Sequence, residues 1–243
     1  MLVLAFDTAQ GACSAAISRH GELLAHDHER MQRGHAEKLL PKIEMVRRRA
    51  GIDYADLDLI AVTIGPGTFT GVRVGLAAAR ALALVHKTPI LGIGTLELLA
   101  QGVLALASGA SGASGASGAP MDCGVIAAID ARRGELYSQA FDPAGVAIAQ
   151  PTVGQIEKIG MDITAFDLSS GVIVGTGAEL LKAVLPGWRI EPRIMFPDAA
   201  VLALAADGWR DRASKTAPSP LYLRAPDARL PGQKGQAAPT TVA

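Results

Sequence analysis

Short apolar runs separated by polar breaks fill the first hundred positions, and their order predicts strands first and helices afterwards. Residues 2–8 form an almost continuous apolar run that reaches a carboxylate near its end, which predicts a buried strand. Residues 14–19 and 22–27 predict two more strands on either side of a His20-Gly21 turn. Three strands joined this closely indicate an antiparallel meander at the start of the chain.

A helix is predicted next, over residues 35–50, because apolar residues recur there at three- and four-residue steps. Gly51 suits the end of this helix, and three arginines in its last turn suit the helix dipole. Residues 57–64 then predict a buried strand, 71–86 a second helix and 89–93 another strand. A strand–helix–strand unit of this kind predicts a parallel pair of strands joined by a helical crossover.

The second half of the chain again predicts strands followed by a strand–loop–helix unit. A run of Ser, Gly and Ala over 108–119 separates it from the first half, and this composition predicts a flexible loop. After Arg229 the chain is rich in Pro, Gly, Gln and Thr, which predicts disorder. The elements expected in between are strands at 124–130, 135–141, 146–149 and 171–174, and helices at 178–185 and 198–206.

These elements predict a duplicated α/β architecture of two lobes, each with a mixed sheet and crossover helices. The actin-like ATPase fold of sugar kinases, Hsp70 and actin is built in this way. We expect an N-terminal lobe over 1–107, the flexible loop over 108–119, a C-terminal lobe over 120–230 and a disordered tail over 231–243.

Composition narrows the class of protein. Apolar residues make up 49% and the mean hydropathy is +0.28, so we expect extra burial, in a thick core or against a partner. The 23 basic and 23 acidic residues balance, which argues against a protein that binds nucleic acid alone. Two cysteines are too few for a disulfide framework. With no basic leader, and with Arg80 inside the longest apolar run, we expect a cytoplasmic protein without a membrane span.

The segment from Gly65 to Arg73, GPGTFTGVR, lies between a predicted buried strand and a predicted helix. Amides at a helix N-terminus attract anions and glycines let a ligand approach, so one interpretation is a phosphate or carboxylate site. The segment matches neither the P-loop nor the dinucleotide-binding pattern. The other interpretation is a tight turn with Thr70 as the helix cap, and the residues leave both open.

Aspartates at strand ends could complete such a site. Asp7-Thr8 ends the first strand, Asp130 is its counterpart in the second lobe, and Gly175-Thr176-Gly177 opens a helix. Aspartates at these positions also cap ordinary turns, so each is a weak signal alone. The residues of this candidate degenerate nucleotide or anion site are Asp7, Thr8, Gly65, Gly67, Thr68, Asp130, Gly175 and Gly177.

The helix over 71–86 is apolar on nearly every side, so it needs cover on more than one face. Its small residues Gly71, Gly75, Ala79 and Ala83 recur at four-residue steps, which lets another backbone approach closely. Burial within its own lobe and a helix–helix interface with a partner both satisfy this pattern.

The five histidines do not predict a metal site. Only His26 and His28 could share a strand face, and no histidine pair stands one helical turn apart. A metallopeptidase is therefore disfavoured, and we expect no bound metal.

Several segments together resemble one family. They are 6–8 (FDT), 35–41 (HAEKLLP), 65–75 (GPGTFTGVRVG), 94–97 (GTLE), 129–135 (IDARRGE) and 221–228 (LYLRAPDA). In these segments the chain is similar to the TsaB family, also called YeaZ. The resemblance runs from the first strand to about Pro231, and the loop over 108–119 and the tail fall outside it.

The resemblance implies an accessory role in a complex. TsaB-type proteins have the actin-like fold and are paralogues of TsaD, which transfers threonylcarbamoyl from its adenylate to the adenosine 3′ to the tRNA anticodon. TsaB pairs with TsaD and the ATPase TsaE joins them, so ATP and threonylcarbamoyl-adenylate are used by the complex. Where TsaD-type proteins carry metal-binding histidines, residues 93–99 of this chain contain none. The resemblance thus implies a non-catalytic subunit that meets tRNA through its partners.

The resemblance also implies that the partner binds the helices over 35–50 and 71–86. The residues expected at this interface are Leu39, Ile43, Val46, Gly75, Leu76, Ala79, Arg80 and Ala83. Two alternatives stay open: a phosphotransferase or ATPase that acts alone through Asp7 and Asp130, and a homodimer that uses the same helices.

Overall fold

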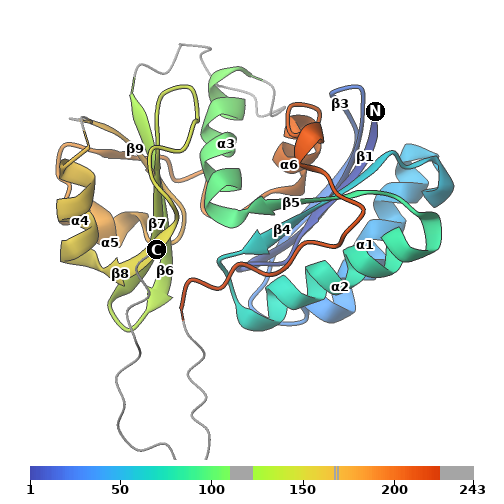
Figure 1. Cartoon of the computed structure of the whole chain (residues 1–243), viewed down its shortest axis with the longest axis horizontal. Coiled ribbons are helices and arrows are strands. Elements are labelled where there is room, and N and C mark those ends of the chain that lie inside the picture. Colours follow the sequence, from blue (N-terminus) through green and yellow to red (C-terminus); the bar gives the residue numbers. More distant parts are fainter. Residues whose placement is uncertain (110–122, 167, 169, 225–243) are drawn as a thin grey trace, which may run out of the picture.

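The computed structural model describes residues 1–109, 123–166, 168 and 170–224 (Figure 1). The tail expected over 231–243 and nearly all of the loop expected over 108–119 lie outside the described residues. Two five-stranded sheets, each covered by helices, stand side by side with one helix between them (Figure 1).

The first sheet has the strand order β3-β2-β1-β4-β5. The first three strands are antiparallel, and β4 and β5 continue the sheet in parallel to β1. This is the meander followed by helical crossovers that the sequence predicts. Its elements are β1 (Leu2–Asp7), β2 (Ala12–Arg19), β3 (Glu22–Arg30), α1 (His35–Ala50), β4 (Leu59–Gly65), α2 (Phe69–His86) and β5 (Ile90–Gly94), with a 3-10 turn η1 (Tyr54–Asp56) before β4.

The second sheet repeats this topology, with the order β10-β9-β6-β7-β8. Here β6 takes the place of β1, β7 and β8 form the antiparallel side, and β9 and β10 the parallel side. The expected duplicated, actin-like fold is therefore confirmed. The elements are β6 (Gly124–Arg132), β7 (Glu135–Phe141), β8 (Thr152–Gln155), α4 (Ile156–Thr164), β9 (Gly171–Val174), α5 (Ala178–Lys182) and β10 (Arg189–Ile190).

The third strand of the second sheet is not where the sequence predicts it. Residues 146–149 form only an isolated antiparallel bridge, between Ala147 and Phe141, and β8 lies further on, paired with the start of β7. The Asp142 carboxylate accepts hydrogen bonds from the amides of Ala144 at 2.9 Å and Val146 at 2.8 Å, which holds the chain in a turn. The apolar side chains that suggested a strand there, Val146 and Ile148, are exposed.

Helix α3 (Thr95–Ala107) lies between the two sheets (Figure 1). Leu96, Leu99 and Val103 pack into a core cluster with the second sheet. Leu98 points the other way, into a cluster with β1, β4 and α6 (Ala199–Ala205). One helix thus contributes to the cores of both lobes.

The lobe boundary needs one correction. Residues 120–230 were expected to form the C-terminal lobe, but α6 packs on the first sheet, opposite α1 and α2. Beyond α6, the 3-10 turn η2 (Arg210–Arg212) and the following segment also return to the first sheet, where Ser214 pairs with Ile90 of β5. The continuous part of the second lobe therefore ends near Ile194, which still belongs to its core cluster, and the chain then runs along the first lobe until Arg224 contacts the second lobe again.

Among the described helices, α2 alone is long and apolar enough to cross a membrane by length and composition. This criterion rests on length and composition alone, and core helices packed on a sheet also meet it. In the structure α2 packs on its own sheet. The residues that it buries there are Gly71, Val72, Gly75, Leu76 and Ala79.

Two neighbouring leucines of α1 test where its core face lies. Leu39 is 1% exposed and belongs to the first core cluster, whereas Leu40 is 57% exposed. We expect Leu39→Ala to lower the free energy of unfolding by about 2–5 kcal/mol, because it leaves a cavity, and Leu40→Ala to change it by less than about 0.5 kcal/mol. Urea denaturation followed by circular dichroism measures both. Equal losses would show that α1 is packed differently.

Candidate functional site

A cleft of about 870 Å³ lies between the two lobes. The first lobe lines it with the β1–β2 turn, the start of α1 and the β4–α2 loop, and the second with the end of β6 and its turn. This is the carboxyl end of β1 and β6, where α/β sheets commonly bind ligands. Of the site residues predicted from the sequence, Gly67, Thr68 and Asp130 line the cleft. Asp7, Thr8, Gly65, Gly175 and Gly177 lie outside its lining.

The glycines of the β4–α2 loop are required by the protein's own backbone. A Cβ atom on Gly67 would stand 2.4 Å from the carbonyl oxygen of Ala9, and one on Gly71 would stand 2.0 Å from that of Thr8. The loop and the β1–β2 turn also bond directly, from the Thr68 amide to the Ala9 carbonyl at 2.8 Å. The Thr8 hydroxyl donates to the Gly71 carbonyl at 2.7 Å.

This packing supports the interpretation of the glycine segment as a tight turn. The glycines allow two loops of the chain to touch. The helix cap is Thr68, whose hydroxyl accepts from the Gly71 amide at 3.1 Å, and not Thr70 as the sequence suggested. Gly65 has a φ of 110° and lies against the Leu221 carbonyl, so it too is fixed by a neighbouring segment.

Asp7 is fully buried beneath the cleft. Its Oδ1 atom accepts from the Thr63 hydroxyl at 2.5 Å and from the Ala9 amide at 3.2 Å. Its Oδ2 atom has no hydrogen-bond partner among the described residues. Burial raises the pKa of Asp7 to about 7, although the bonds from Thr63 and Ala9 oppose this shift.

The second lobe provides a smaller set of contacts. The Asp130 carboxylate accepts from the Arg132 amide at 2.7 Å, and the Asp130 amide donates to the Thr176 hydroxyl at 3.1 Å. Gly177 donates to the Ala128 carbonyl at 3.0 Å, and a Cβ atom on Gly175 would stand 2.3 Å from the same oxygen. The loop of residues 175–177 is thus folded onto the end of β6, and its two glycines lie against the backbone of that strand.

The charges of the cleft also differ from those of a phosphate site. Its described lining contains two arginines, Arg33 and Arg132, and two carboxylates, Glu37 and Asp130. A lining with this balance has no excess of positive charge to hold a polyphosphate. Among the described residues, no three His, Cys, Asp or Glu side chains are grouped so that they could hold a metal ion.

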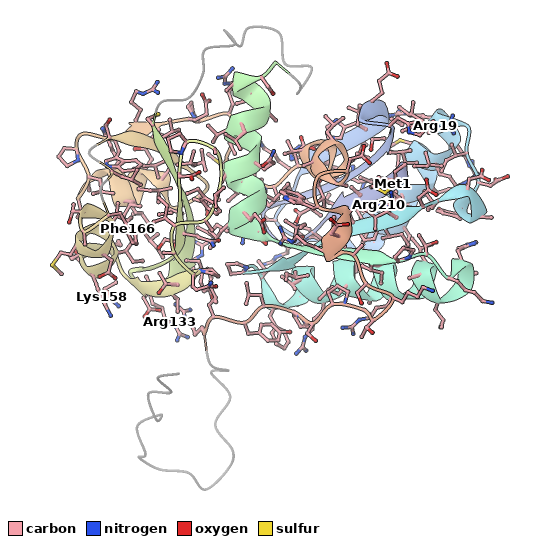
Figure 2. All side chains as sticks on the ribbon, turned by 45° about the horizontal axis from the view of Figure 1, so that its top comes forward. Met1, Arg19, Arg133, Lys158, Phe166 and Arg210 are labelled. Atoms are coloured by element: carbon pink, nitrogen blue, oxygen red, sulfur yellow. The ribbon has the colours of Figure 1, made fainter. Side chains whose placement is uncertain are left out.

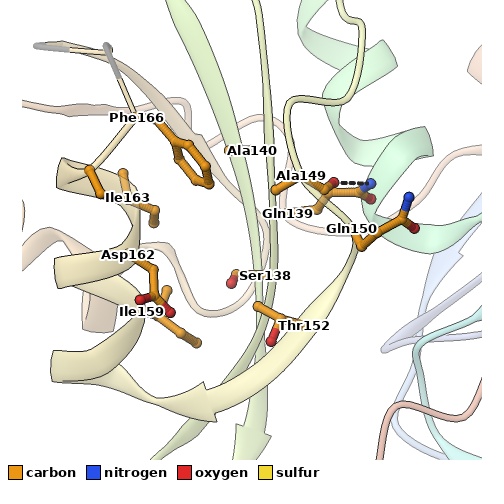
Figure 3. Close-up of a pocket in the computed structure, with 11 residues that line it drawn as sticks. Ser138, Gln139, Ala140, Ala149, Gln150, Thr152, Ile159, Asp162, Ile163 and Phe166 are labelled. Carbon is orange, nitrogen blue, oxygen red and sulfur yellow. Dashed lines mark hydrogen bonds between the residues drawn. The ribbon is translucent and has the colours of Figure 1, made fainter. Parts of the chain in front are cut away.

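A separate cavity of about 390 Å³ lies in the second lobe, between α4 and the strands β7 and β8. Figure 3 shows Ile159, Ile163 and Phe166 on the helix side and Ser138 and Thr152 on the strand side. The Gln139 side chain donates to the Ala149 carbonyl at 3.0 Å at its rim. No residue of the predicted site lies in this cavity.

The residues predicted for a partner interface lie mostly inside the first lobe. Leu39, Ile43, Val46, Gly75, Leu76 and Ala79 are buried, and the side chains among them pack into its core. Ala83 is partly buried against that core, and Arg80 alone is exposed. Substitutions at Leu76 or Ala79 would therefore disturb the fold before they tested an interface.

The small residues of α2 fit it closely against its own sheet. A Cβ atom on Gly75 would stand 3.0 Å from the Thr8 hydroxyl and 3.3 Å from the Val62 side chain. The opposite face of α2 carries Ala77, Ala81 and Leu84, which are exposed. Arg73 and Arg80 are also exposed and lie on this face, because residues 73, 77, 80 and 84 share one side of a helix. Their charges could therefore have identified the outer face from the sequence.

The contact between the glycine loop and the β1–β2 turn can be tested by adding one methyl group. We expect Gly71→Ala to lower the free energy of unfolding by about 3 kcal/mol, because the new Cβ overlaps the Thr8 carbonyl. In Gly208→Ala the Cβ would be 3.6 Å from its nearest neighbour, so we expect a change below about 0.5 kcal/mol. Urea denaturation compares the two, and a stable Gly71→Ala protein would contradict the contact.

The buried Asp7 gives a pH dependence of defined sign. Its pKa is raised from 3.8 to about 7, so the folded protein holds this proton more tightly than the unfolded chain does. The contribution of Asp7 to stability is therefore complete at low pH and is lost as the pH rises through this interval.

Asp7→Asn keeps the acceptor for Thr63 and Ala9 but cannot ionise. We compare the free energy of unfolding of this variant with that of the natural protein. The difference should increase in favour of the variant between about pH 4 and pH 7, and it should stay constant above about pH 7. Urea titrations across this range measure the difference, and parallel curves would show that Asp7 has no such role.

Comparisons with known proteins agree with this architecture. A family model described as tRNA N6-adenosine threonylcarbamoyltransferase (TsaD) matches residues 27–164. The chain is 33% identical to the tRNA threonylcarbamoyladenosine biosynthesis protein TsaB of Escherichia coli over 210 residues, which cover 85% of this chain and 83% of that protein. The solved structure of YeaZ from Pseudomonas aeruginosa superposes with a TM-score of 0.72 and 28% identity, over 91% of this chain and all of that one. The shared fold and the identity over most of both chains show that this protein belongs to the TsaB (YeaZ) family of tRNA threonylcarbamoyladenosine biosynthesis proteins.

Proposed function

We propose that this chain is a non-catalytic scaffold subunit, in the cytoplasm, of the complex that transfers threonylcarbamoyl to the tRNA adenosine. In this proposal it pairs with a TsaD-type paralogue, and a TsaE-type ATPase joins the pair. This chain contacts the tRNA only indirectly, through the complex, and the complex uses ATP and threonylcarbamoyl-adenylate. The observation that carries the proposal is an exposed apolar surface on α1 and α2.

This surface, the outer helix face, consists of Leu40 on α1 and Ala77, Ala81, Leu84 and Val85 on α2. Leu84 is 83% exposed and Val85 72% exposed, although both belong to a helix that is packed on its sheet. Helices α1 and α2 contact one another. Exposed apolar side chains on helices that contact one another, with arginines on the same helix, are typical of a protein-binding surface.

The cleft supports the non-catalytic part of the proposal. The glycines of both lobes are occupied by backbone contacts, Asp7 is buried away from the cleft lining, and the charges of that lining balance. We infer from these contacts and charges that the cleft is not a nucleotide site of the kind used for phosphate transfer. We therefore assign no chemical step to this chain.

Size exclusion with light scattering is the first test. The protein is measured alone and mixed with the TsaD-type protein of its own organism. A stable one-to-one complex supports the scaffold role. Failure to pair, together with ATP hydrolysis by the isolated chain, would favour a phosphotransferase or ATPase that acts alone. A dimer of the isolated chain that persists in the mixture would favour self-association through the same helices.

Charge placed on the outer helix face tests its position. We expect Leu84→Glu to weaken pairing by at least about 30-fold, the effect of losing one central apolar contact worth about 2 kcal/mol. Because Leu84 is exposed, the thermal unfolding temperature should stay close to that of the natural protein.

Met161→Glu is the matched control. Met161 is 65% exposed on α4, in the other lobe, so the same charge there should leave pairing unchanged. Binding is measured by isothermal titration calorimetry against the TsaD-type protein. Equal affinities for the Leu84 variant and the natural protein would place the interface elsewhere, even if the family role is right.

A further inference from the structure

The last described segment, residues 213–224, crosses from one lobe to the other, and we call it the strap. It starts on the first lobe, along the edge strand β5. The Ile90 amide donates to the Ser214 carbonyl at 2.8 Å, and the Ser214 amide donates to the Ile90 carbonyl at 3.0 Å. The strap then follows the first lobe beside α2 towards the second, as Figure 1 shows in red.

Three side chains of α2 and the end of β4 hold the middle of the strap. Arg80 donates to the Pro218 carbonyl at 2.8 Å, and the Leu221 amide donates to the Ile64 carbonyl at 2.8 Å. The Arg73 Nε atom donates to the Tyr222 hydroxyl, also at 2.8 Å. The Tyr222 ring stacks on Phe69 with 5.8 Å between ring centroids.

The end of the strap is bound to the second lobe. The Arg224 guanidinium donates to the Ala131 carbonyl at 3.0 Å and forms an ion pair with the Glu135 carboxylate. It also lies over the Tyr137 ring, at 5.9 Å from the centroid. Ala131 and Tyr137 line the cleft, so Arg224 is attached to the wall of the cleft that the second lobe provides.

The strap has little slack at the crossing. Tyr222 is bound to the first lobe and Arg224 to the second, and two residues of extended chain span at most about 7 Å. Helix α3 joins the lobes by apolar packing, with the strap passing below it in Figure 1. A rotation that opens the cleft about α3 therefore pulls on the side-chain anchors at Tyr222 and Arg224.

We propose that the strap is a clamp that fixes the two lobes relative to one another, and that Arg224 is the residue that locks it. The clamp sets the width of the cleft. This inference does not depend on the scaffold role, since every contact in it lies within the chain.

The distance between two spin labels, one on each lobe, tests the clamp. Arg19 and Lys158 are exposed and lie near opposite ends of the molecule (Figure 2), so each is changed to cysteine for labelling. Cys123 is replaced by serine. Cys13 stays in place, because it is buried and burial raises its pKa to about 12, which leaves its thiol unreactive near neutral pH.

Pulsed electron paramagnetic resonance then compares Arg224→Ala, Arg73→Gln and Arg48→Ala in this labelled protein. Arg48 pairs with Glu44 within α1, so its loss removes an arginine–glutamate pair that does not cross between lobes. We expect the distance distribution to become roughly twofold wider in Arg224→Ala and in Arg73→Gln, and to stay unchanged in Arg48→Ala.

An unchanged distribution in a folded Arg224→Ala protein would overturn the clamp. If that variant does not fold, Arg73→Gln decides, since it removes the hydrogen bond from Arg73 to the Tyr222 hydroxyl at an exposed position. Equal broadening in all three variants would also overturn the proposal, because it would show a general loss of rigidity.

Discussion

Helix α3 is the constraint on which the architecture depends, because it is buried from two sides. Its Leu96, Leu99 and Val103 complete the core of the second sheet, while Leu98 completes a core on the first. A helix shared in this way fixes how far apart the sheets stand, and the cleft exists because they are held at that separation. Close packing on both faces also leaves α3 little freedom to slide. The second lobe therefore moves, if at all, by turning about this helix.

Much of the fold could be predicted from the sequence, but α3 could not. The strands of the first lobe, α1 and α2 have clear periods and turn residues. Residues 95–107 are apolar on almost every side, so they have no amphipathic period to recognise. The helix of residues 156–164 is short, but Ile156, Ile159 and Ile163 recur at three- and four-residue steps, so its period does predict an amphipathic helix.

An apolar stripe or a glycine motif does not reveal whether its neighbour is the same chain or another molecule. The period of α1 correctly identifies Leu39, Ile43 and Val46 as one face, but a period cannot say whether a face meets its own sheet or a partner. The same holds for Gly67 and Gly71, whose missing side chains make room for carbonyl groups of the chain itself. A glycine pattern reports that something lies close, and only the tertiary structure tells whether that is a ligand or the protein.

The two arginines of α2 lie between the strap and the exposed apolar face of the same helix. Arg73 and Arg80 hold the strap through Tyr222 and Pro218, and they also lie beside the exposed Ala77 and Leu84. A protein that covers this face would remove water from both guanidinium groups and so strengthen their bonds to the strap. Association at the helices and stiffness between the lobes are then linked free energies, and by reciprocity a looser strap weakens association. A distant substitution such as one at Arg224 would thus lower the affinity for a partner that it never touches.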